Sequence, residues 1–150
     1  RPNTRVGLGD PSSVCVGLYG VEVLEGAGLA DQVRPTIVTY AQSCSATAGL
    51  VALGTVDVAL GWRVFGAWNA DLVEVLPVDP RYLPRLGEIP AAVTTVSGQP
   101  DEAARLVGYL AGPTCREAFA RHGYVVSEEE ARLHAPRAAI GGRYELPGGW

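Results

Sequence analysis

Short apolar runs alternate with segments of helical spacing over the first sixty residues. Residues 5–9 (RVGLG) form an apolar run that ends in turn residues, which predicts a strand. Apolar residues then recur at the spacing of one helix face, at Val14, Leu18, Val21 and Leu24. The sequence Gly26-Ala27-Gly28 is expected to end that helix. A second strand over 37–40 and a second short helix over 46–53, ended by Gly54, repeat the pattern.

Residues 56–62 form a nearly unbroken apolar run, which predicts a third strand buried on both faces. Two strand–turn–helix units followed by a strand favour an α/β fold. We therefore expect a parallel sheet with right-handed crossovers.

The second half of the chain is less regular. We expect strands over 73–76 and 89–96, separated by a loop that contains Pro77, Pro80 and Pro84. Pro100-Asp101-Glu102 opens a helix over 103–111, Gly112-Pro113 breaks it, and Thr114 is expected to cap a further helix that runs to His122. A helical turn and a loose tail should follow. The expected organisation is a lobe over 1–97, a helix pair over 98–126 and a tail over 127–150.

Composition narrows the function. The 150 residues suit one domain, and 47% apolar with 19% charged residues is typical of a globular chain. The net charge is −4, and the twelve basic residues are scattered arginines, so we expect no nucleic-acid partner. Because the net charge is negative, an anion site would have to rely on local dipoles rather than on the overall charge of the protein. No apolar run is long enough to span a membrane. Arg1–Thr4 does not resemble a signal peptide, which a secreted precursor could have lost.

Candidate chemistry lies in the two turns that follow the first two strands, Asp10–Cys15 and Gln42–Ser45. Both should lie at the carboxyl edge of the sheet, where ligands bind in parallel α/β folds. Each turn leads into a helix N-terminus, whose unpaired amides can hold an anion. Four hydroxyl groups could add donors, those of Ser12, Ser13, Ser43 and Ser45. The alternative is that these serines only cap their own helices.

Three ordered segments resemble the periplasmic molybdate-binding proteins of ABC importers. RVGLGDPSSVCVGLYGVEVLEGAGLADQV resembles the family's strand, "GDP" turn and first helix. VDVALGW resembles its later strand, and EIPAAVTTVSGQPDEAARLVGYLAGPTCREAFARHGY resembles its C-terminal strand and helix pair. The resemblance covers about residues 5–125. It implies one parallel-sheet lobe of a type II periplasmic binding protein, whose other lobe precedes this sequence.

The resemblance also implies a site and a role. The oxyanion contacts fall on the amide of Val16, beside Cys15, and on Cys44, while Trp62 stands where the family has a tyrosine hydroxyl. The ligand would be molybdate or tungstate, with no cofactor, metal centre or catalysis. The partners would be a small oxyanion and the membrane permease of the importer. The implied location is periplasmic or extracellular, as a lipoprotein or secreted protein.

Two other function classes stay open. The same lobe could be the ligand-sensing domain of a regulator, which the sequence upstream would decide. Cys15 and Cys44 both lie at helix starts and could ligate a soft metal or form a disulfide, or be two small buried residues. Two thiols without a nearby histidine make a poor zinc site. With Cys115 the number of cysteines is odd, which does not suit a disulfide framework. We expect His122 to cap a helix and Asp57 to be structural. The sequence contains no hydrolase or nucleotide-binding motif.

The resemblance leads to three further expectations, on selectivity, affinity and association. A donor-only site disfavours protonated phosphate, and cavity size would then separate molybdate from sulfate. With one lobe, binding of molybdate should be weak, because part of the donor shell is missing. Four apolar side chains would lose part of their cover, those of Leu106, Val107, Leu110 and Phe119. The chain should then pair with its missing N-terminal lobe or with a second copy of itself.

Overall fold

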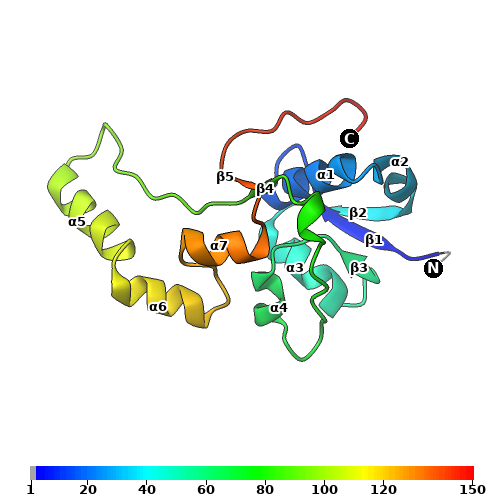
Figure 1. The fold of residues 1–150 in the computed structure, drawn as a ribbon, viewed down its shortest axis with the longest axis horizontal. Coiled ribbons are helices and arrows are strands. Elements are labelled where there is room, and N and C mark those ends of the chain that lie inside the picture. The colour runs from blue at the N-terminus through cyan, green and yellow to red at the C-terminus, as the bar shows by residue number, and fades with distance from the viewer. Residues whose placement is uncertain (1–2) are drawn as a thin grey trace.

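A three-stranded parallel sheet forms the centre of the lobe in the computed structural model, which describes residues 3–150 (Figure 1). Strand β1 (Val6–Gly9) lies between β2 (Ile37–Ala41) and β3 (Val58–Ala59). Both pairs are parallel, so all three strands end at the same edge of the sheet. The predicted α/β fold with a parallel sheet is confirmed.

Helices follow the first two strands, as the apolar spacing predicted. Helix α1 (Cys15–Gly26) follows β1, and α3 (Cys44–Ala52) follows β2. Glycines with positive φ lie just after both helices, at Gly28 (φ 67°) and Gly54 (φ 69°), where other residues would be strained. Shorter elements complete this part of the chain: α2 (Ala30–Val33), the 3₁₀ turn η1 (Arg34–Thr36) and α4 (Val64–Trp68).

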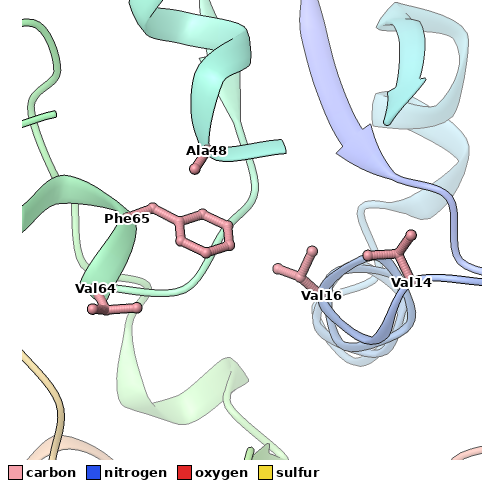
Figure 2. Close-up of a cluster of buried hydrophobic side chains, with 5 residues drawn as sticks. All are labelled: Val14, Val16, Ala48, Val64 and Phe65. Carbon is pink, nitrogen blue, oxygen red and sulfur yellow. The ribbon is translucent and has the colours of Figure 1, made fainter. Parts of the chain in front are cut away.

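The core lies between the sheet and these helices. Leu8 of β1 and Val21 of α1 are fully buried. A second cluster joins the start of α1 to α3 and α4, and Figure 2 shows its members, which are Val14, Val16, Ala48, Val64 and Phe65. The start of α1 is thus held on the lobe by apolar packing of its own first residues.

Three predicted strands need correction. The third is a short edge strand, only Val58–Ala59, with Val58 44% exposed rather than buried on both faces. Residues 73–76 and 89–96 form no strand. Their β-branched composition suited a strand, but neither segment pairs with a strand of the two sheets, Pro90 lacks a ladder donor, and much of 89–96 is exposed. A 3₁₀ turn η2 (Pro80–Tyr82) lies in the intervening loop instead.

The expected C-terminal helix pair is confirmed. Helices α5 (Pro100–Leu110) and α6 (Pro113–Arg121) extend away from the sheet (Figure 1), and neither contains a buried residue. The predicted cap at Thr114 is wrong, because α6 begins one residue earlier at Pro113, with Gly112 as its N-cap. Proline is well suited to the first helical position, since its missing N–H has no helical acceptor there.

The tail after residue 126 is ordered against the lobe, which corrects the expectation of a loose tail. Helix α7 (Glu128–His134) is capped by Ser127, whose hydroxyl accepts from the Glu130 amide at 3.1 Å. Strand β5 (Ala139–Ile140) then pairs in parallel with β4 (Arg85–Leu86). At the end of the chain the Trp150 indole donates to Glu25 at 2.6 Å. Over residues 3–150, no helix has the length and apolar character needed to cross a membrane.

Candidate functional site

The two turns that follow β1 and β2 are joined by side-chain and backbone hydrogen bonds. The Asp10 backbone amide donates to the Ala41 carbonyl at 2.8 Å, and the Gln42 side-chain nitrogen Nε2 donates to the Asp10 carboxylate at 3.1 Å. The Ser13 hydroxyl lies 3.4 Å from the Gln42 side-chain oxygen. The prediction that both turns share one edge of the sheet is therefore confirmed, and α1 and α3 both begin there.

Glycine allows α1 to start so close to the sheet. A Cβ on Gly17 would overlap the carbonyl oxygen of Gly9 at the end of β1. A Cβ on Gly9 would lie 2.9 Å from Val16 and 3.2 Å from the Thr47 hydroxyl of α3. The end of β1 is thus enclosed by the first turns of both helices, and this brings their N-termini to one place.

The first amides of both helices have no acceptor within their own helix. Helix α1 has no side-chain cap, and its first backbone bonds run from Gly17 and Leu18 to the Val14 carbonyl. In α3 the corresponding bond runs from Thr47 to Ser43. The amides before these bonds have no acceptor within their helix, and they include the four at Cys15, Val16, Cys44 and Ser45. Such groups carry the partial positive charge that attracts anions at helix N-termini.

The four serine hydroxyls are engaged within the turns. Ser12 donates to Asp10 at 2.6 Å, while Ser13 faces Gln42. Ser43 caps α3 by accepting from the Ala46 amide at 3.0 Å, and its hydroxyl lies 3.1 Å from that of Ser45. Ser43 therefore caps α3, whereas Ser12 and Ser13 do not cap α1. A contact of any of these serines with a ligand stays a prediction.

Asp10 is a carboxylate at this edge that was not among the candidate site residues predicted from the sequence. The hydroxyl of Ser12, then the Ser12 amide and then Gln42, lower the pKa of Asp10 to about 2. Asp10 is therefore ionised at neutral pH, and its oxygens accept three hydrogen bonds from the turns. The expected donor-only site thus has a negative charge in its supporting turns. The Asp-x-Ser spacing, which is typical of an Asx turn, is the signal that could have found it.

The two cysteines at the helix starts face each other. The Sγ atoms of Cys15 and Cys44 are 3.7 Å apart, and Cys15 is exposed. Burial, and then the hydrogen bond with Cys44, raise the pKa of Cys15, while the amides of Val16 and Cys15 act in the opposite direction. Within the described residues, no three His, Cys, Asp or Glu side chains come together as a metal site.

Trp62 lies beside this edge but in a packing position. Its ring is 4.9 Å from that of Tyr19 on α1, in an edge-on arrangement. Trp62 and Cys44 both pack on the apolar cluster that contains Val16. A Cβ on Gly87 would lie 3.0 Å from the Trp62 ring, so the indole is also covered from the β4 side. The structure brings Trp62 to the predicted residues, and ligand donation by its indole stays a prediction.

Comparisons with known proteins were consistent with this geometry. The model of a family described as bacterial extracellular solute-binding protein matches residues 1–125. A solved structure, the periplasmic molybdate-binding protein of Azotobacter vinelandii, is similar to this chain with a TM-score of 0.59 and 16% sequence identity. The match covers 85% of this chain and 56% of that one, so the present chain spans little more than half of its length. The search of curated proteins found no match.

Proposed function

The chain belongs to the bacterial extracellular solute-binding protein family, and we propose that it binds a tetrahedral oxyanion, molybdate or tungstate, for an ABC importer. The observation that carries the proposal is the convergence of two helix N-termini at one sheet edge, joined by the Asp10–Gln42 hydrogen bond. The similar Azotobacter protein, whose name states molybdate binding, supports this ligand class.

In the proposed site, neutral donors hold the dianion. The amides of Val16 and Cys44 each belong to a different helix, so two dipoles point at the bound oxygens. A charge-assisted hydrogen bond contributes about 1.5–3 kcal/mol. The Asp10 carboxylate repels a dianion, and three hydrogen bonds from Ser12 and Gln42 screen part of its charge. Fully deprotonated oxyanions suit such a site, since the amide donors offer no acceptor to an acidic O–H on the ligand, and the Asp10 oxygens already accept three hydrogen bonds.

The proposed role is capture and delivery without catalysis. The partners are the permease of the importer and, across the site, a first lobe that supplies further donors. The proposed location is the periplasm or the cell exterior, in keeping with the family. A sensing domain with the same fold is the second candidate. It differs in its partner, which would be a regulatory domain rather than a permease.

Calorimetry with paired proline variants tests the binding site. Cys15 and Cys44 are both the first residue of a helix, and each follows a residue in extended conformation, so proline fits at either position. Cys44→Pro removes one of the proposed ligand donors, whereas Cys15→Pro removes an amide that is not one of them. We expect Cys44→Pro to weaken molybdate binding about tenfold, which corresponds to one charge-assisted bond, and Cys15→Pro to change it little.

Sulfate and phosphate serve as competing ligands in the same titrations. Because one lobe supplies only part of the donor shell, we expect weak binding of molybdate by this chain, well above nanomolar dissociation constants. Equal weakening by the two proline variants would contradict the assigned donors. Absence of any molybdate or tungstate binding at millimolar concentration would contradict the proposed ligand.

A further inference from the structure

The fold brings together two thiols that are distant in the sequence. Between Cys15 and Cys44 lie the rest of α1, helix α2, the 3₁₀ turn η1 and strand β2, yet the two Sγ atoms are 3.7 Å apart. Each occupies the first position of its helix, and the hydrogen bonds between Asp10, Ser13 and Gln42 fix the two turns relative to each other. The proximity is therefore a product of the tertiary structure.

We propose that Cys15 and Cys44 are a redox pair that forms a reversible disulfide across the starts of α1 and α3. A disulfide requires about 2.05 Å between the sulfurs, so closure needs roughly 1.7 Å of relative movement. Cys15 is exposed, and an oxidant can reach it. Metal binding is the weaker alternative, because no third ligand lies nearby among residues 3–150.

The oxidant is a low-molecular-weight disulfide of the glutathione class. Cys15 loses its proton to solvent, and its thiolate attacks one sulfur of the oxidant, which releases one thiol and leaves a mixed disulfide. Cys44 then loses its proton and attacks Cys15 Sγ, which releases the second thiol. Two protein thiols are oxidised by two electrons, and one external disulfide is reduced to two thiols. Disulfides persist in the compartments where extracellular solute-binding proteins work.

The inference does not depend on the identity of the ligand. If formed, the bond would tie together the two helix starts that carry the amides of Val16 and Cys44. The oxidation state would then set how freely these two donor groups move relative to each other. Cys115 lies on α6, outside these turns, and serves as the internal control.

Thiol titration of the whole chain in glutathione buffers tests the proposal. On oxidation we expect the three reactive thiols to fall to one, and dithiothreitol to restore all three. The Cys115→Ser variant should fall from two thiols to none, and peptide mass mapping should find Cys15 linked to Cys44. The equilibrium constant for oxidation should fall about tenfold or more in urea, because unfolding separates the thiols.

Two results would overturn the inference. One is retention of three thiols at oxidising glutathione ratios, and the other is a mapped bond that includes Cys115. Mapping of the unmodified chain decides the matter even where a serine variant fails to fold. The titration needs no oxyanion, so a chain that does not bind molybdate can still confirm or contradict the redox pair.

Discussion

Arg85 of β4 and Glu22 of α1 form a two-point ion pair inside the protein, with the Arg85 Nη2 atom 2.8 Å from Glu22 Oε1 and Nε 3.0 Å from Oε2. The two side chains are only 6% and 13% exposed. The guanidinium also lies 5.4 Å from the Tyr19 ring and 5.8 Å from that of Tyr144. This contact attaches the small β4–β5 sheet to the first helix of the lobe.

Removal of one member of this pair should destabilise the chain strongly. Arg85→Met keeps the apolar stem but leaves the Glu22 carboxylate buried without its partner, and we expect a loss of about 3–5 kcal/mol in urea unfolding. The matched control is Arg105→Met, which breaks the exposed Arg105–Glu102 pair and should lower stability by less than about 1 kcal/mol. A double variant with Glu22→Gln should recover part of the loss. Equal effects of Arg85→Met and the control would contradict this account.

Acid should loosen the turn after β1. The pKa of Asp10 is about 2, below its ordinary value of 3.8, so its contribution to stability is present above about pH 4 and is lost as the pH falls through 2. Carbon-detected NMR titration should place the Asp10 midpoint near 2. Ser12→Ala removes the largest cause of the low pKa and should move that midpoint upward. A midpoint already near 3.8 in the unmodified chain would refute the hydrogen-bonded turn.

The approach of α1 to β1 should not tolerate a methyl group at Gly17. Gly17→Ala would push the new Cβ into the Gly9 carbonyl, and we expect a loss of about 3 kcal/mol with displacement of the start of α1. Gly49→Ala on α3 is the control, because the nearest atom, in Leu53, would be 3.7 Å away. That variant should be neutral or gain up to about 1 kcal/mol. Denaturant unfolding of both proteins measures the difference.

The α5–α6 pair should make the chain associate. Leu106, Leu110 and Phe119 are 58%, 38% and 39% exposed, and the helices extend away from the lobe (Figure 1). We expect light scattering at micromolar concentration to show self-association, or capture of a separately supplied N-terminal lobe. Leu106→Glu should reduce association, whereas Leu53→Glu, at a leucine on the lobe that is 82% exposed, should not. A clean monomer would remove the case for a missing partner.

The early part of the fold could be predicted because local signals agree there. Apolar spacing in 14–24, the Ser43 cap and the glycines after α1 and α3 all favour the structure that forms. The absence of strands over 73–76 and 89–96 could not be predicted in this way. Residues 89–96 are rich in β-branched side chains, but a strand needs a neighbouring strand with unpaired backbone groups. The local sequence does not indicate whether such a neighbour exists.

The candidate site was predictable in position and less so in chemistry. Parallel strands share a carboxyl edge, so the meeting of Cys15 with Cys44 follows from topology. Hydrogen-bond partners depend on turn geometry, and the use of Ser12 by Asp10 was missed because its one sequence signal, the Asp-x-Ser spacing, was not used. Trp62 was assigned from an aligned tyrosine, whereas its packing against Tyr19 and Gly87 depends on residues far apart in sequence.

The parallel pairing of β4 with β5 makes the intervening segment a natural place for changes of length. Leu86 pairs with Ile140, so both ends of the connecting segment that contains α5 and α6 are fixed to the same small sheet. Parallel strands need a connection of at least about a dozen residues, and closure of a longer one costs little more. A designer could therefore shorten, extend or replace α5 and α6 while the lobe keeps its own fold, and use the position to append a reporter domain.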